Sequence, residues 1–315
     1  FGGQRRYGDT QMKLSTKHLL DIHNLSRKDI NLIFKLTSHL KKKQMKNKQH
    51  SYLKYKTLAL LFAKPSTRTR VSFEVGMTHL GGTSIDLAGD KMQLFKGRES
   101  IKDTASGLSR YVEAIVARLY SHLDLLELAD HSTVPIINGL TDFNHPCQAL
   151  TDLYTIEEKL GSLKNRHLVF VGDGSSNVCN SLIQACYKLG VKITVATPRY
   201  YHPHSAVMER TGHFAKVIDN AKEAVKDADV IYTDSWVSMG QEKDRTNKIR
   251  RLKGFQVNAK LLSYAPSQVM IMHCLPAHRG YEITDDVIDG PHSIVFDQAE
   301  NRLHVQKAIL VLLMK

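Results

Sequence analysis

The sequence predicts an α/β protein of two domains, each with a central parallel sheet flanked by helices. Apolar, β-branched runs alternate with helical patterns along nearly the whole chain, which is typical of parallel sheets covered on both faces. A length of 315 residues suits two domains of ordinary size. Polar residues recur directly after the predicted strands, and ligands of open α/β sheets bind beyond these carboxyl ends. The fold class therefore already favours a binding site where strand ends meet.

The predicted strands are short apolar runs rich in β-branched residues. They are expected at residues 57–63, 114–120, 134–138, 167–172, 192–197, 230–233, 269–273 and 294–296. Helical patterns lie between them, at residues 149–160, 179–189 and 221–228 among others.

The division between the domains is expected at the Asn144-His145-Pro146 breaker, which is followed by one long helix. Residues 1–145 would form the first domain and residues 146–299 the second, with the long helix joining them. A final helix at residues 302–314 is long enough for residues 300–315 to pack back on the first domain.

Composition excludes several classes of protein. Hydrophobic content of 42% and charged content of 24% are those of a globular protein, and no apolar run reaches the roughly 18–20 residues of a membrane span. The first eight residues lack the apolar segment of a secretory signal. Cys147, Cys179, Cys186 and Cys274 form no Cys-x-x-Cys pair, which argues against a disulfide framework or a zinc site and favours a reducing, cytoplasmic compartment.

The net charge of +13 fits nucleic-acid binding, attraction of anionic substrates, or a solvated basic face. The densest cluster, Lys41-Lys42-Lys43 with Lys46 and Lys48, has no interleaved aromatic residue and no nucleic-acid module around it. A solvated face is therefore the favoured interpretation, and we expect neither a nucleic-acid nor a membrane partner.

The stretch Ser66-Thr67-Arg68-Thr69-Arg70 falls between a predicted buried strand and the start of a helical pattern. A helix N-terminus offers free N–H groups and partial positive charge, and Arg supplies a planar fork that matches phosphate oxygens. The alternative is an exposed loop whose Ser or Thr only caps the helix.

A dinucleotide site at Gly172-Asp173-Gly174 fails on its details. The fingerprint requires a third small residue where Asn177 stands, and the next strand ends without an acidic residue for a ribose hydroxyl. Nicotinamide binding is accordingly not expected.

Four further segments matter together with the Ser-Thr-Arg-Thr-Arg turn. They are His145-Pro146-Cys147-Gln148, Asp234-Ser235-Trp236-Val237-Ser238-Met239-Gly240, His273-Cys274-Leu275-Pro276 and Glu300-Asn301-Arg302. In order and spacing this set resembles the aspartate/ornithine transcarbamylase family, over nearly all of the chain after the first dozen residues. The Ser-Met-Gly loop and the His-Cys-Leu-Pro segment resemble the ornithine branch of that family.

The resemblance implies a carbamoyl-phosphate domain followed by an amino-acid domain, with no metal and no organic cofactor. It also implies a homotrimer, or a multiple of trimers, with sites at subunit interfaces. The activity implied is transfer of the carbamoyl group from carbamoyl phosphate to the δ-amine of L-ornithine, a step of arginine metabolism and amino-acid biosynthesis.

The resemblance also assigns residues to the first substrate. Carbamoyl-phosphate binding falls to Ser66, Thr67, Arg68, Thr69, Arg70, Gln93, Arg118, His145, Gln148, Cys274, Leu275 and Arg302. Burying a phosphate dianion requires several cationic donors, and Arg118 in an apolar strand is costly without an anionic partner. Thr69, Arg118 and His145 would donate to the carbonyl oxygen as negative charge develops, and Gln148 would accept from the carbamoyl NH₂.

For the second substrate, the resemblance assigns Asp234 and Ser238 to the α-ammonium group, and Asn177 and Met239 to the α-carboxylate. Cys274 and the Leu275 carbonyl would lie beside the reacting amine, so Arg118, His145, Asp234 and Cys274 form the expected catalytic set. A one-residue shift in the turn would give the role of Asn177 to Ser176. In the loop at residues 90–100, either Gln93 or a nearby Lys would reach the neighbouring subunit's site.

Direct attack by the neutral δ-amine is the expected mechanism, because the phosphate leaving group needs no covalent enzyme intermediate. The rivals are carbamoyl transfer to putrescine or to an N-acylated ornithine, or a non-catalytic basic protein that binds anions or nucleic acid on the same fold.

Overall fold

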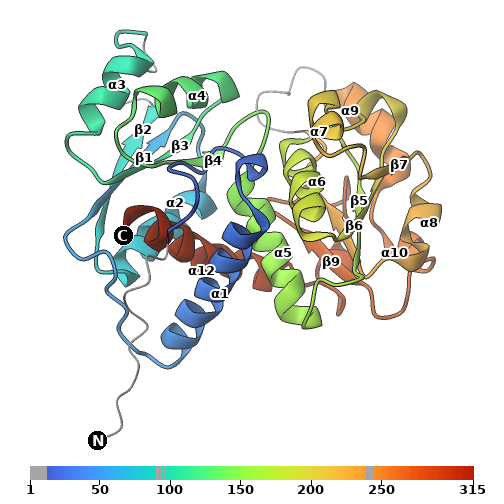
Figure 1. Ribbon diagram of the computed structural model, residues 1–315. Coiled ribbons are helices and arrows are strands. Elements are labelled where there is room, and N and C mark those ends of the chain that lie inside the picture. Colours follow the sequence, from blue (N-terminus) through green and yellow to red (C-terminus); the bar gives the residue numbers. More distant parts are fainter. Residues whose placement is uncertain (1–12, 90–91, 93, 95–96, 238–244) are drawn as a thin grey trace, which may run out of the picture.

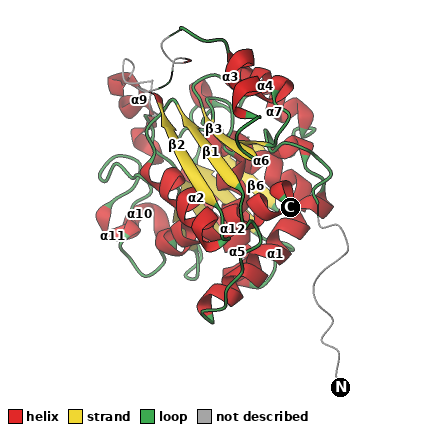
Figure 2. Ribbon diagram, turned by 90° about the vertical axis from the view of Figure 1, so that its left-hand side faces the viewer, coloured by secondary structure: helices red, strands yellow, loops and turns green. Residues whose placement is uncertain are grey.

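Two parallel sheets with helices around them form two lobes that lie side by side in Figure 1, and Figure 2 shows strands enclosed by helices from a second direction. This computed structural model describes residues 13–89, 92, 94, 97–237 and 245–315. The predicted fold class, two parallel-sheet domains flanked by helices, is confirmed.

The first sheet has the strand order β2-β1-β3-β4, and all its strands run parallel. Its strands are β1 (Thr57–Phe62), β2 (Thr83–Ala88), β3 (Ala114–Arg118) and β4 (Ile136–Leu140). The helices of this lobe are α1 (Arg27–Met45), α2 (Thr67–His79), α3 (Ile101–Leu108) and α4 (His122–His131). β1 and β3 are central and almost wholly buried, so their apolar runs are continuous rather than alternating.

The second sheet has the order β7-β6-β5-β8-β9, also parallel. Its strands are β5 (His167–Val171), β6 (Lys192–Ala196), β7 (Lys216–Ile218), β8 (Val230–Thr233) and β9 (Met270–His273). Its helices are α6 (Asn177–Leu189), α7 (Ser205–Arg210), α8 (Ala221–Ala224), α9 (Arg245–Leu252), α10 (Ala259–Leu262) and α11 (Asp285–Ile288).

Two long helices tie the lobes together. α5 (Pro146–Leu160) packs against β4 of the first lobe and α6 of the second. α12 (Val295–Met314) packs on α1, α2 and α5 and contacts β9, which brings the C-terminal helix back to the first lobe as predicted (Figure 1). The domain boundary expected between residues 145 and 146 stays a prediction, because α5 contacts both lobes.

The predicted strand at residues 294–296 is wrong. Ser293 forms a single parallel bridge with Ile271, and α12 begins at Val295, so the helix starts well before the predicted residue 302. The apolar run Ile294-Val295-Phe296 is followed by Asp297, an acidic residue in the first turn of the helix, and then by the helix formers Gln298, Ala299 and Glu300, so the helix forms despite the local β-propensity. The edge strands β2 and β7 have no counterpart among the predicted strands, because Thr83, Ser84 and Asp86 leave β2 without a continuous apolar run and β7 has only three residues.

Packing explains two glycines of the rejected dinucleotide turn. Gly172 has a φ of +131°, in the region that favours glycine, and a Cβ there would lie 3.2 Å from the indole nitrogen of Trp236. A Cβ on Gly174 would lie 2.7 Å from the carbonyl oxygen of Tyr201. Both glycines are therefore required by the protein's own packing.

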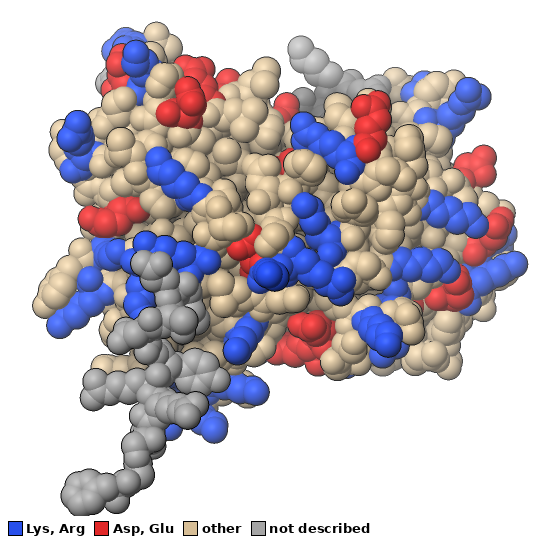
Figure 3. All heavy atoms as spheres, viewed as in Figure 1, with Lys and Arg blue, Asp and Glu red and all other residues tan. Residues whose placement is uncertain are grey.

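Lys and Arg side chains are spread over both lobes on the face shown in Figure 3, with Asp and Glu side chains among them. Lys41 of the predicted cluster forms an ion pair with Glu158 and donates to Asn301 at 2.7 Å. Within the described ranges, none of the helices has the length and apolar character needed to cross a bilayer.

Candidate active site

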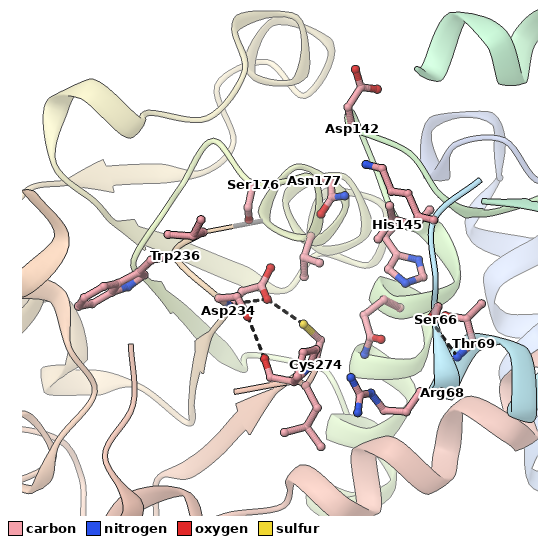
Figure 4. Close-up of a pocket in the computed structure, with 18 of the residues that line it drawn as sticks. Ser66, Arg68, Thr69, Asp142, His145, Ser176, Asn177, Asp234, Trp236 and Cys274 are labelled. Atoms are coloured by element: carbon pink, nitrogen blue, oxygen red, sulfur yellow. Dashed lines mark hydrogen bonds between the residues drawn. The ribbon is translucent and has the colours of Figure 1, made fainter. Parts of the chain in front are cut away.

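A cavity of about 770 Å³ lies between the two lobes, at the carboxyl ends of strands from both sheets (Figure 4). The first lobe contributes the turn after β1, the start of α2, and the end of β3. The second contributes the start of α6 and the loops after β8 and β9, while α5 and α12 supply residues from between the lobes. Such a position is where open α/β sheets bind their ligands.

The cavity has two walls of different character. We call the first the basic wall, made of Ser66, Thr67, Arg68, Thr69, Arg118, His145, Gln148 and Arg302. We call the second the acidic wall, made of Asp234, Ser235, Cys274 and Leu275. Figure 4 shows Arg68, Thr69 and His145 on one side and Asp234 and Cys274 on the other.

The N-terminus of α2 contributes four residues to the basic wall, Ser66 to Thr69. Ser66 caps the helix, because its hydroxyl accepts from the Thr69 amide at 3.4 Å. Thr69 is fully buried, and its hydroxyl accepts from Arg302 Nη2 at 2.6 Å. The N-terminus of α2 therefore combines a Ser cap, polar side chains and the nearby Arg302 guanidinium, which suits it to bind an anion.

Arg68, Arg118 and Arg302 line the cavity from three different elements. Each has a buried Nε atom without a hydrogen-bond partner, and none pairs with a carboxylate in the described part of the chain. Burial lowers the pKa of Arg118 to about 10, with a further contribution from the neighbouring Arg302 and Arg68 charges. Burial also lowers the pKa of Arg302. Three guanidiniums held together in this way require an anionic ligand to balance them.

His145 and Gln148 stand at the start of α5. The His145 backbone N–H donates to Ser181 Oγ at 2.8 Å, while its ring Nδ1 is buried without a partner. Burial, reinforced by Arg302 and Arg118, holds the pKa of His145 well below its ordinary value. The imidazole is therefore neutral near pH 7 and serves as a hydrogen-bonding group rather than as a cation.

The acidic wall is organised by Asp234, which follows β8. Its Oδ1 accepts from the Cys274 thiol at 2.9 Å and from the Ser235 amide at 2.7 Å. Burial raises the pKa of Asp234, and burial together with the Asp234 charge raises the pKa of Cys274 well above its ordinary value. Cys274 is therefore a protonated thiol that donates to the carboxylate, not a thiolate nucleophile.

The segment after β9 has an unusual backbone. Leu275 has a φ of +57°, rare for a non-glycine residue, and the bond to Pro276 is cis. The Leu275 N–H donates to His273 Nδ1 at 2.9 Å, and the Ser235 hydroxyl donates to the Pro276 carbonyl at 2.8 Å. These bonds fix Cys274 and Leu275 beside Asp234.

Asp234, His273 and Cys274 also place potential metal-ligand atoms within 4.8 Å of one another. The contacts above already use these atoms, since His273 Nε2 lies 3.1 Å from the buried Glu282 carboxylate. Hydrogen bonding within the protein accounts for this cluster.

The structure brings together most of the predicted residues, but not Arg70. Arg70 does not line the cavity; its half-exposed guanidinium pairs with Asp86 at 2.9 Å and Glu74 at 3.3 Å. Two residues along a helix correspond to a turn of roughly 200°, so Arg68 and Arg70 point to different sides. Gln93, Ser238 and Met239 lie outside the described residues.

Asn177 and Ser176 both line the cavity, so the alternative between them stays open. Ser176 caps α6 by accepting from the Cys179 amide at 3.2 Å, whereas Asn177 Nδ2 donates to the Thr141 carbonyl at 2.6 Å.

Several residues that line the cavity are not among the predicted site residues, and Lys64, Asp142 and Trp236 are three of them. Lys64 is buried with its ammonium 4.3 Å from the centre of the Tyr120 ring, and it directly precedes the Pro-Ser-Thr-Arg turn. Asp142 follows β4 and accepts from the His122 amide at 2.9 Å. Trp236 is buried with an unpartnered indole nitrogen. A charged residue at a strand end and the chain's single tryptophan beside Asp234 were the available signals.

Comparison with protein families gives two matches that together cover most of the chain. Residues 17–158 match the family described as aspartate/ornithine carbamoyltransferase, carbamoyl-P binding domain. Residues 164–313 match the corresponding Asp/Orn binding domain.

Individual relatives agree with these matches. The chain is 51% identical over 311 residues to an ornithine carbamoyltransferase of Pyrococcus horikoshii, covering 96% of this chain and 97% of the relative. It is 50% identical over 301 residues to that of Archaeoglobus fulgidus, covering 95% and 97%. An anabolic ornithine carbamoyltransferase of Pyrococcus furiosus is 51% identical over 311 residues, covering 96% and 98%.

Solved structures of ornithine carbamoyltransferases are also similar to this chain. Ornithine carbamoyltransferase from Pyrococcus furiosus superposes with a TM-score of 0.90 at 51% identity, covering 94% of this chain and 96% of that one. The Thermus thermophilus enzyme gives a TM-score of 0.86 at 41% identity, covering 95% and 99%.

Proposed function

Because this chain belongs to the aspartate/ornithine carbamoyltransferase family, we propose that it transfers the carbamoyl group of carbamoyl phosphate to the δ-amine of L-ornithine. The products are L-citrulline and phosphate. The observation that carries the proposal is one cavity with a basic wall facing an acidic wall, which matches an anionic carbamoyl donor and an amino-acid acceptor. We also propose a role in arginine biosynthesis, supported by the anabolic relative from Pyrococcus furiosus.

The basic wall binds the phosphate. Its dianion accepts from Ser66, Thr67, Arg68 and Thr69 at the N-terminus of α2, and from Arg118 and Arg302. This ligand charge offsets most of the charge of the three guanidiniums that have no carboxylate partner in the described part of the chain.

The same wall stabilises the transition state. As the amine attacks, negative charge develops on the carbamoyl oxygen, and Arg118, His145 and the Thr69 hydroxyl donate to it. Preorganised donors in a dry site act strongly because they need no reorganisation during the reaction. A neutral His145 fits this role, since it donates without adding a further cation beside Arg118 and Arg302.

The acidic wall orients ornithine. Asp234 binds the α-ammonium group, with Ser238 assisting, and Asn177 or Ser176 with Met239 binds the α-carboxylate. Cys274 and the Leu275 carbonyl then lie beside the δ-nitrogen. An alkyl ammonium has a pKa of about 10.4, so the δ-amine must lose a proton before its lone pair attacks the carbamoyl carbon. The bond to phosphate breaks as the tetrahedral intermediate collapses, and the phosphate takes the remaining proton.

We further propose a homotrimer, or a multiple of trimers, in which Gln93 or a nearby Lys completes the neighbouring site. β2 stands at the edge of its sheet and leaves Ile85 exposed, and Val71 on the adjacent α2 is exposed as well. α2 and β2 are in contact, and exposed apolar side chains on neighbouring elements are typical of a subunit contact. Sedimentation equilibrium should give a mass three times that of the chain, or a multiple of it; a monomer would contradict this part of the proposal.

We propose a cytoplasmic location because the cysteines, which all lie in the described ranges, form no disulfide bond. All four thiols are free, and three of them are buried. Such thiols persist in a reducing compartment.

The direct test is a colorimetric citrulline assay on the purified protein with carbamoyl phosphate. L-ornithine should support turnover, whereas N-acetylornithine lacks the ammonium for Asp234 and putrescine lacks the carboxylate. If turnover is faster with either analogue, that analogue and not ornithine would be the acceptor. Salt-sensitive binding to nucleic acid without carbamoyl transfer to any of the three would favour a non-catalytic protein.

A further inference from the structure

Asp152 is a fully buried carboxyl group that lies behind the basic wall, one turn of α5 beyond Gln148. It does not line the cavity. Its Oδ1 accepts from Gln148 Nε2 at 2.8 Å and from Gln298 Nε2 at 2.7 Å. Gln298 lies on α12, so one oxygen joins two helices and two amide side chains.

The orientation of both amides follows from a backbone group that can only donate. The His273 N–H donates to Gln298 Oε1 at 3.0 Å, which turns Gln298 Nε2 toward Asp152. The same oxygen, Asp152 Oδ1, accepts a hydrogen bond from Gln298 Nε2 and another from Gln148 Nε2. The chain of bonds thus begins at β9, directly before Cys274, and ends at the basic wall.

This chain of bonds leaves Gln148 Oε1 as the atom available to a ligand. Gln148 lines the cavity, and its Oε1 is buried without a partner. A buried amide oxygen without a donor is costly, and a ligand N–H would satisfy it. With the amide reversed, the Gln148 NH₂ would face the NH₂ of a carbamoyl group, and the two donors would oppose each other.

We propose that Asp152 is a positioning residue, which fixes the Gln148 amide so that its oxygen selects a carbamoyl NH₂ over a methyl group at the same place. The inference rests on the proposed function, since it concerns how the same site recognises its carbamoyl donor. Asp152 does not line the cavity, so its effect on the carbamoyl group passes through Gln148.

Acetyl phosphate is the matching probe, because it has the phosphate and carbonyl of carbamoyl phosphate and a methyl group in place of the NH₂. The experiment measures the KM for carbamoyl phosphate and the Ki values of acetyl phosphate and inorganic phosphate during citrulline formation. In Asp152→Leu and Asp152→Ala, the preference for carbamoyl over acetyl phosphate should fall by about 10-fold or more. The Ki of phosphate should stay within about threefold of its wild-type value, because the phosphate donors are unchanged.

Asp152→Asn is the conservative control. Its Oδ1 can still accept from both amides, since the His273 N–H holds Gln298 in place, so the wild-type preference should be retained. Gln148→Met should remove the preference by itself, and adding Asp152→Ala to it should cause no further loss of preference. Leu is larger than Asp and Ala is smaller, so the two variants disturb the packing around residue 152 in opposite ways. A loss of preference shared by both variants is therefore not explained by one packing defect.

An unchanged preference in both Asp152→Leu and Asp152→Ala would overturn the inference, as would an equal loss of affinity for all three phosphates. A loss of preference in Asp152→Asn would also overturn it, because the acceptor would not be what matters. The proposed function is judged separately: it fails if the wild-type protein forms no citrulline, whatever the variants do.

Discussion

The basic wall of the cavity carries three guanidiniums, whereas the facing acidic wall carries a carboxylate and a thiol. The two walls differ in how these groups are satisfied. Arg68, Arg118 and Arg302 have no carboxylate partner in the described ranges, while Asp234 already accepts bonds from Cys274 and Ser235. The basic wall therefore depends on its ligand for charge balance, and the acidic wall is largely assembled before any ligand arrives.

This difference separates two tasks that one cavity must perform. A site rich in unpaired donors binds a dianion and stabilises a developing oxyanion. A preformed carboxylate with a neutral thiol beside it orients an ammonium group and avoids a second negative charge near the phosphate. Each of the cavity variants below changes one wall and should leave the other intact, whereas Arg70→Ala changes neither wall.

Removal of the Arg118 guanidinium should have the largest effect. Arg118→Ala should lower kcat by about 10²–10³-fold or more, because a donor to the developing oxyanion is lost. The ornithine affinity should change little. Near-wild-type turnover of this variant with carbamoyl phosphate would mean that another group polarises the carbonyl.

Neutralising the acidic wall should affect the other substrate. Asp234→Asn keeps the shape of the side chain but removes the charge that pairs with the α-ammonium, so the KM for ornithine should rise by about 10- to 100-fold. The KM for carbamoyl phosphate should stay within about threefold. Equal weakening of both substrates would show that the walls do not act separately.

The thiol reports the electrostatics of the acidic wall without any substrate. Burial and the Asp234 charge raise the pKa of Cys274, so its alkylation by iodoacetamide should be slow at pH 8 and should accelerate as the pH rises further. In Asp234→Asn the negative charge is absent, the thiol pKa falls, and alkylation at pH 8 should be about threefold faster or more. Peptide mass spectrometry resolves Cys274 from the three buried cysteines. A slower reaction in the variant would contradict the assigned hydrogen bond.

Arg70 provides the smallest expected effect and a control within the same helix. Because its guanidinium pairs with Asp86 and Glu74 outside the cavity, Arg70→Ala should keep turnover within about threefold of wild type. The free energy of unfolding should fall by about 1 kcal/mol or less, as for other exposed ion pairs. Arg68→Ala should instead raise the KM for carbamoyl phosphate at least 10-fold. Similar losses in the two variants would indicate that Arg70 also serves the phosphate.

The sequence was most informative where the chemistry lies at strand ends. Asp234 and Cys274 each follow a predicted strand and Arg118 lies near the end of another, and parallel strands bring their carboxyl ends to one edge of each sheet. The relative position of Arg302 required knowledge of how α12 packs, which local pattern does not contain, and the family resemblance supplied it.

Other features could have been derived from spacing and were not. Arg68 and Arg70 stand two residues apart in a helix, which places them on different faces. Asp152 stands four residues after Gln148 and so shares its face. The bond from Asp152 to Gln298 joins residues 146 positions apart, and only tertiary structure reveals such a contact.

The central claim is that the two walls, of opposite charge, bind the two substrates side by side in one cavity. Calorimetric titration with a single compound tests this claim most directly. The compound carries a phosphonoacetyl group on the δ-nitrogen of L-ornithine and spans both walls. We expect one tight site per chain, with affinity at least 10-fold lower in Arg68→Ala and, independently, in Asp234→Asn. Binding that is weakened by only one of the two substitutions, or by neither, would contradict the account.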